Sequence, residues 1–260
     1  MKSKISKFDV IFQQYLLANL SMFKIVFSLL LLIQSSLSAQ IDSLPKANKS
    51  KGSFAKQLIL PTSLGIAGII VKETNFREYF QEKVQSSRLK TNTKVDDYIQ
   101  YVPIVELHAA DIYYSKPINE IFQNSKNLII AELFTALIVQ SIKHTVNIKR
   151  PDGHDYSFFS GHTSQSFTGA TALYIEYGET NRLYALSGYG FSTATGILRI
   201  TNNRHWLSDV LVGAGIGIFS ARLIWYINPF PNWKPFKDKK VAIYPYVNGL
   251  SNNAGFRVIF

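Results

Sequence analysis

The sequence predicts an all-α protein, a helical bundle of about six helices followed by a short C-terminal β-hairpin. Apolar blocks long enough for helices follow one another, and polar or Gly/Pro-containing links separate most of them. Alternation of apolar and polar residues, which would indicate strands, is missing until the end of the chain. The six blocks are Leu58–Val71, Tyr98–Tyr114, Leu128–Ile142, Thr163–Tyr177, Leu183–Leu198 and Trp206–Ile227.

The end of the chain has a different pattern. Two runs, VAIYPYV and GFRVIF, stand on either side of the turn-rich stretch NGLSNNA. Runs rich in Val, Ile, Tyr and Phe around Asn and Gly predict two strands joined by a turn. One hairpin cannot close a barrel. We expect this hairpin to belong to a C-terminal extension, residues 231–260, that follows the helical domain.

The N-terminal region has the layout of a secretory signal peptide. Lys24 precedes an apolar run from Ile25 to Ile33, and a small-residue stretch ends at Ala39. The run has nine residues, whereas a membrane span needs ~20, so we expect cleavage. Because the pattern begins at Met22, that residue is an alternative translation start. We therefore expect a signal peptide region over 1–39, a flexible polar leader over 40–57 and the helical domain over 58–230.

The composition excludes several kinds of chemistry. The 260 residues contain no cysteine, which excludes disulfides, a thiolate nucleophile and cysteine-based metal sites. The five histidines form no HExxH motif, so we expect neither a metal nor another cofactor. The formal charge of +11 favours an anionic partner, which charge alone leaves open between nucleic acid, an anionic membrane surface and a phosphorylated substrate.

Two groupings in the second half of the chain could bind an anion. Lys143 and Arg150 lie seven residues apart, which in a helix places both on one face. Ser160, Gly161 and His162 precede an apolar block, where serine would cap the helix and free N–H groups would point at an anion. Taken singly, a basic helix end is usually a solvated face, and a capped helix can carry an incidental histidine.

A third grouping supplies a potential nucleophile. His205 and Asp209 are four residues apart, so a carboxylate could hold one ring nitrogen and leave the other exposed. Asn202 and Asn203 mark a turn that would bring Arg199 towards His205. His and Asp at this spacing also occur on helices by chance.

Taken together, the three groupings resemble the motif of the type 2 phosphatidic acid phosphatase superfamily, KxxxxxxRP, PSGH and SRxxxxxHxxxD. Two positions depart from it, because Phe159 replaces the proline and Leu198 replaces the first serine of the last part. The resemblance implies the helical fold of acid phosphatases and vanadium haloperoxidases. The matching residues are Lys143, Arg150 and Pro151, then Ser160, Gly161 and His162, then Arg199, His205 and Asp209.

The resemblance also implies a reaction. His205 would attack phosphorus and form a phosphohistidine, Asp209 would support it, and His162 would protonate the leaving oxygen. The chain would then be a metal-independent phosphatase acting on phosphate monoesters, with a phosphorylated lipid or a small phosphate ester as partner and no nucleic acid. The residues that would bind the phosphate are Lys143, Arg150, Ser160, Gly161 and Arg199.

Two alternatives stay open at this point. Vanadate-dependent haloperoxidases have a similar anion site, but such enzymes are usually longer. A non-catalytic envelope protein that binds anionic lipid through the same fold is the other alternative, and the two motif departures leave it open.

The lengths of the apolar blocks indicate where in the cell the protein is located. Leu58–Val71 has 14 residues, and Leu128–Ile142 has 15 and contains Glu132, whereas spans need ~20 apolar residues. After a cleaved signal, three spans would also carry Lys143 back to the cytoplasmic side. The sequence therefore favours an exported domain in the periplasm or cell envelope, peripheral to a membrane, over one embedded in it.

Overall fold

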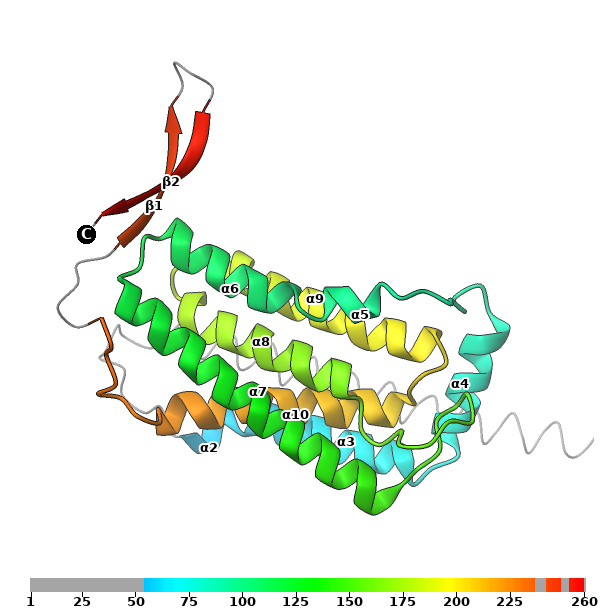
Figure 1. Cartoon of the computed structure of the whole chain (residues 1–260). Helices are drawn as coiled ribbons and strands as arrows, with labels where there is room; N and C mark the ends of the chain where they lie inside the picture. Colours follow the sequence, from blue (N-terminus) through cyan, green and yellow to red (C-terminus); the bar gives the residue numbers. More distant parts are fainter. Residues whose placement is uncertain (1–53, 237–241, 249–252, 260) are drawn as a thin grey trace, which may run out of the picture. The chain divides into compact units, whose positions relative to one another are not determined.

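The computed structural model describes residues 54–236, 242–248 and 253–259, and within them the protein is mostly helical (Figure 1). The predicted helical class is therefore confirmed. Five helices carry or surround the predicted motifs. They are α6 (Val102–Tyr113), α7 (Ile118–Val146), α8 (Gly161–Tyr177), α9 (Arg182–Thr201) and α10 (Leu207–Ile227).

Five of the six predicted blocks each correspond to one helix, with α3 (Ile59–Lys72) accounting for the first, whereas the block Tyr98–Tyr114 covers the end of one helix, α5 (Asp96–Ile99), and all of α6. The number of about six is not confirmed, since the described residues form nine helices. No block predicted α2 (Phe54–Gln57) or α4 (Phe76–Ser86), and α5 was not separated from the block that holds α6. These segments are short or polar, so they lack the long apolar run on which the prediction relied.

Helix α7 is much longer than its predicted block. It has 29 residues, because its first ten, Ile118–Asn127, continue the helix with polar side chains that an apolar block does not include. Some of these polar residues are buried with partners, as when Asn124 donates a hydrogen bond of 2.9 Å to Asp111. The 15-residue block that argued against a membrane span is therefore only part of this helix.

Helix α8 packs against four others, α6, α7, α9 and α10, and Figure 1 shows it in their midst. Its contact with α10 depends on glycines. A Cβ atom on Gly217 would collide with the carbonyl oxygen of Ser164, and one on Gly213 would lie 2.8 Å from that of Ser160. Small residues let helix backbones approach closely, so these glycines bring the start of α10 next to the start of α8.

Three helical segments of the described chain are long and apolar enough to cross a membrane, namely Phe54–Lys72, Ile118–Val146 and Leu207–Ile227. On α7, Ile129, Leu133 and Leu137 follow one another at intervals of four residues and are 58%, 60% and 67% exposed. Such an apolar stripe facing outward is typical of contact with lipid or another apolar surface. Membrane association is thus better supported than the block lengths suggested.

The two strands lie where the sequence predicts a hairpin. β1 (Ala242–Asn248) and β2 (Asn253–Ile259) pair antiparallel, with Ala242 opposite Ile259 and Asn248 opposite Asn253. Residues 1–53, which include the predicted signal peptide region and most of the leader, lie outside the described residues. The predicted domain boundaries therefore stay predictions.

Candidate active site

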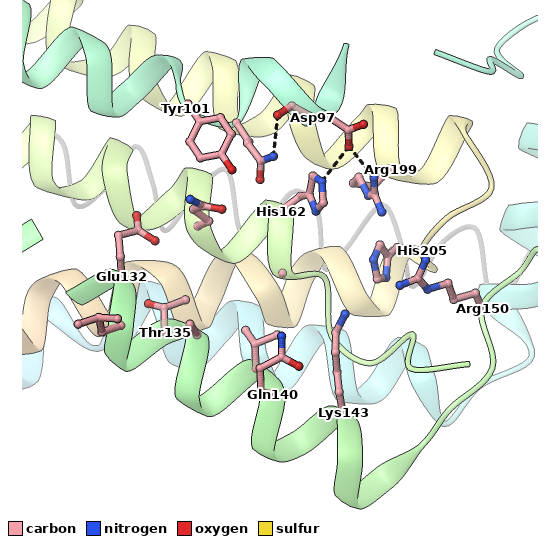
Figure 2. A pocket seen from close by; sticks show the side chains of 16 residues that line it. Asp97, Tyr101, Glu132, Thr135, Gln140, Lys143, Arg150, His162, Arg199 and His205 are labelled. Carbon is pink, nitrogen blue, oxygen red and sulfur yellow. Dashed lines mark hydrogen bonds and ion pairs between the residues drawn. The ribbon is translucent and has the colours of Figure 1, made fainter. Parts of the chain in front are cut away.

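A cavity of about 680 Å³ brings together most of the residues singled out in the sequence (Figure 2). It lies where α7, α8 and α9 meet the loops that follow α7 and α9. Asp209 and Ser160 are buried rather than part of its wall. The predicted residues that do line it are Lys143, Arg150, Gly161, His162, Arg199 and His205.

His205 is held at the cavity wall by a buried carboxylate. Its Nδ1 lies 3.3 Å from Oδ2 of Asp209, and both side chains are 1% exposed. Asp209 is fixed in turn, because the same oxygen accepts a bond of 3.1 Å from the backbone N–H of Trp206 at the start of α10. Ser157, which the sequence analysis missed, donates its hydroxyl to that oxygen as well.

This environment keeps His205 neutral. Burial lowers the pKa of His205 from 6.5 to about 4, against the opposing effect of Asp209, and Arg199 and Lys143 lower the pKa further. A neutral imidazole that donates Nδ1–H to Asp209 has its lone pair on Nε2. The His205 side chain is one of those that line the cavity.

Lys143 and Arg150 reach the cavity by a route that differs from the predicted one. The sequence placed them on one helical face, but α7 ends at Val146 because Asn147 adopts a left-handed conformation with φ of 37°. Arg150 therefore lies in the following loop, where its backbone N–H donates a bond of 2.7 Å to the carbonyl of His154. The expectation of two turns on one helix is wrong, although both cations line the cavity.

Arg199 is anchored by a residue outside the motifs. Its Nη1 lies 2.6 Å from Oδ2 of Asp96, and the two side chains are 8% and 2% exposed. Asp96 also accepts a bond of 3.0 Å from Asn202. The Nε atoms of Arg150 and Arg199 are buried and have no partner in the described residues. Because an unpaired buried donor costs free energy, these two guanidinium groups are suited to bind an anion.

His162 lies in the first turn of α8, and Figure 2 shows it across the cavity from Lys143. Its Nε2 is 2.9 Å from Oδ1 of Asp97. Burial and then Arg199 lower the pKa of His162, while Asp97 opposes them. Ser160 caps α8 as predicted, accepting from the N–H of Thr163, and its hydroxyl is used there rather than at the cavity.

The two motif departures lie away from the cavity wall. Phe159 is 2% exposed and packs with Val139 and Val212, so it contributes to the core. Leu198 does not line the cavity either. Among the described residues, no three His, Asp or Glu side chains gather in the manner of a metal site.

Asp96 and Asp97 are the site residues that sequence reasoning missed. They form the first turn of α5, more than 40 residues before Lys143, and belong to no motif of the superfamily described above. The available signal was weak: two adjacent carboxylates just before an apolar block, which also fits an ordinary helix start.

Comparison with known proteins agrees with this geometry. Residues 125–233, which contain every predicted site residue, match the family model of the PAP2 superfamily. The resemblance to the type 2 phosphatidic acid phosphatase superfamily is thereby confirmed over this part of the chain.

A curated relative is the lipid A 1-phosphatase of Porphyromonas gingivalis, which is 37% identical over 141 residues. The match covers 53% of this chain and 31% of that protein, so the chain spans about a third of the relative's length.

Two solved structures are similar. Aquifex aeolicus LpxE has 22% identity and a TM-score of 0.46, over 60% of this chain and 98% of that one. The first transmembrane PAP2 type phosphatidylglycerolphosphate phosphatase from Bacillus subtilis has 16% identity and a TM-score of 0.50, over 68% and 98%. The second likeness supports the fold.

Proposed function

We propose that this chain is a metal-independent phosphatase that hydrolyses phosphate monoesters, with lipid phosphates of the cell envelope as substrates and a phosphohistidine as intermediate. The main support is the buried, neutral His205, held by Asp209 and facing a cavity that three cationic side chains line. An imidazole nucleophile beside fixed positive charges is suited to phosphoryl transfer, where catalysis consists mostly of positioning and charge stabilisation.

The residues suggest the following steps. Nε2 of His205 attacks phosphorus, and the bond to the alcohol oxygen breaks while His162 gives that oxygen its proton. Water then attacks the phosphohistidine, His162 takes a proton from the water, and phosphate leaves as His205 regains its lone pair. Lys143, Arg150 and Arg199 neutralise the phosphoryl oxygens, in the place that magnesium has in kinases.

The lipid part of the proposal rests on the outside of the bundle. The helices that border the cavity include α7, whose exposed apolar stripe and length suit a bilayer. A lipid could present its phosphate to the cavity while its chains stay at that surface. The name of the Porphyromonas gingivalis relative agrees with such a substrate. Export to the periplasm or cell envelope is part of the same proposal and rests on the signal-like N-terminal sequence.

The first test concerns metals. Because three side-chain cations line the cavity, phosphate release from a lipid phosphate panel and from p-nitrophenyl phosphate should persist in excess EDTA. Vanadate should inhibit, since it mimics five-coordinate phosphorus. Loss of activity in EDTA that a divalent cation restores would contradict the mechanism.

The second test concerns pH. The free protein needs neutral His205 and protonated His162. As the pH increases, kcat/KM for an alkyl phosphate should therefore rise through about pH 4, where His205 loses its proton. It should decrease again as His162 loses its proton, at a pH lower than the ordinary histidine value of 6.5. Asp97 raises the pKa of His162 more than Asp96 does, so Asp97→Asn should lower this pKa and move the falling limb to lower pH. Asp155→Asn, an exposed carboxylate outside the cavity, is the control.

The phosphate ester itself also loses a proton near pH 6, and this ionisation affects the same part of the pH profile. The test must therefore compare esters with different leaving groups. p-Nitrophenolate leaves without being protonated, and its ester should keep the same falling limb in wild type and Asp97→Asn. A shift of equal size for both esters would show that Asp97 does not act through His162.

A further inference from the structure

Trp206 connects the surroundings of His205 to the loop that carries Arg150. It directly follows His205 in the chain and is half-buried at the start of α10. Its indole Nε1–H donates a hydrogen bond of 2.9 Å to the backbone carbonyl of Lys149, 57 residues earlier in the chain. Its backbone N–H donates to Asp209, which holds Nδ1 of His205. One residue therefore contacts both the loop after α7 and the carboxylate that orients the imidazole.

The carbonyl that accepts from the indole belongs to the peptide bond between Lys149 and Arg150. The N–H of the same peptide bond donates a hydrogen bond of 2.7 Å to the carbonyl of His154. A peptide bond is planar, so fixing both its C=O and its N–H determines where the Cα atom of Arg150 lies. From there the Arg150 side chain reaches the cavity, and Figure 2 shows it on the same side as His205. The backbone of Arg150 is thus held by one contact within its loop and by one with Trp206.

The indole ring is held in turn by α4, a helix that belongs to none of the motifs. The guanidinium group of Arg77 lies over the ring, 5.1 Å from its centroid, where the ring quadrupole attracts a cation. From the next turn of α4, Gln81 donates a hydrogen bond of 3.0 Å to the carbonyl of Ile200 near the end of α9. Helix α4 therefore supports both the indole and the end of the helix that leads to His205.

The hydrogen bond from Trp206 is better suited to positioning than to stability. It lies at a partly exposed place, where water can replace it, so its net contribution to folding is small. Position matters more for the reaction, because a displacement of about 1 Å can lower a rate by as much as about 10²-fold. Arg150 and His205 would have to meet the same phosphoryl group, so their relative placement affects both binding and turnover.

We propose that Trp206 is a positioning residue that fixes Arg150 relative to His205. It does so through the hydrogen bond from its indole N–H to the carbonyl of Lys149. The inference rests on the proposed phosphatase function, in which His205 attacks the phosphorus whose oxygens Arg150 neutralises. Because the acceptor is a main-chain oxygen, Lys149→Ala keeps it and should behave nearly as wild type.

The test replaces the indole of the full chain by rings with and without the donor. Trp206→Phe keeps a six-membered ring and loses the N–H, whereas in Trp206→His the imidazole Nε2 takes the place of the indole Nε1 and can donate. At pH 8, where imidazole is neutral, the Kd of inorganic phosphate should rise about 3- to 10-fold in Trp206→Phe, as expected for one lost hydrogen bond. It should rise less in Trp206→His. A packing role predicts the opposite order, because histidine fills less space than phenylalanine.

Trp225→Phe is the matched control. It removes an indole N–H that donates a hydrogen bond of 2.8 Å to Glu176 outside the cavity, so the Kd of phosphate should not change. A double-mutant cycle then asks whether Trp206 acts through Arg150. In an Arg150→Ala background, Trp206→Phe should change the Kd by less than about twofold. In a Lys143→Ala background it should have its full effect.

Because the cycle measures binding, it can be read separately from the proposed reaction. If these results are obtained and no ester is hydrolysed, the phosphatase proposal fails and the positioning role stands. The role is refuted if Trp206→Phe leaves the Kd unchanged, if Trp206→His binds phosphate more weakly than Trp206→Phe, or if the effects of Trp206→Phe and Arg150→Ala multiply. A wild-type chain that does not bind phosphate would overturn both proposals.

Discussion

Replacing His205 by alanine is expected to abolish turnover of every phosphate ester, with a loss on the order of 10⁶-fold, as when other covalent catalysts lose their nucleophile. The side chain is nearly fully buried at the cavity wall, and Asp209 holds its Nδ1 in place. His162→Ala should behave differently. Loss of a general acid costs roughly 10²- to 10⁴-fold, and only for leaving groups that need a proton.

Rapid-quench measurements with radiolabelled phosphate separate the two roles. The His162→Ala variant should still form an acid-labile phosphoenzyme from p-nitrophenyl phosphate and should be impaired mainly on alkyl phosphates. The His205→Ala variant should form none. The roles are wrongly assigned if a phosphoenzyme accumulates in His205→Ala, or if the two variants lose activity equally across leaving groups.

Removing the cations gives the second large effect. Lys143→Ala and Arg199→Ala should each lower kcat about 10²- to 10³-fold, the size found when one group that stabilises transition-state charge is deleted. Arg199 needs a second comparison, because its loss leaves the buried carboxylate of Asp96 without its charge partner. Such an orphaned charge destabilises a protein by ~3–5 kcal/mol. The Arg199→Ala/Asp96→Asn double variant should recover stability but not activity.

Steady-state kinetics together with thermal unfolding distinguish these effects. Lys149 and Arg204 lie at variable positions of the same motifs, and neither lines the cavity, so their alanine variants should behave nearly as wild type. Arg204 is partly exposed and pairs with Asp152, 3.3 Å away. A Lys143→Ala protein with unchanged kcat would remove that residue from the site.

Much of this arrangement can be predicted from sequence because the motifs are local. His205 and Asp209 are four residues apart, and the turn through Asn202 and Asn203 returns the chain from α9, where the His205 N–H bonds to the Arg199 carbonyl at 3.2 Å. The capping role of Ser160 likewise depends on neighbours within one turn. Short-range geometry of this kind is fixed by residue type and spacing.

Long-range partners could not be predicted in this way. Asp96 is 103 residues from Arg199, and nothing in either segment specifies the pairing. In the sequence, Glu132 was interpreted only as a charged residue that argues against a membrane span. Its position on the cavity wall could not be predicted, because it depends on how α7 faces α8. The left-handed Asn147 also changed the route of the chain to Arg150, since one backbone conformation decides whether a helix continues.

The ion pair between Asp96 and Arg199 also sets a limit on how this protein can be divided. Arg199 lies inside the family match, which begins at residue 125. Asp96 lies 29 positions before the start of that match. A fragment cut at the edges of the match would keep every motif residue and lose the carboxylate that orients Arg199. A chimera that receives residues 125–233 from this chain would need an acidic residue from its host in the place of Asp96, so exchange of catalytic modules between relatives depends on a segment that motif comparison ignores.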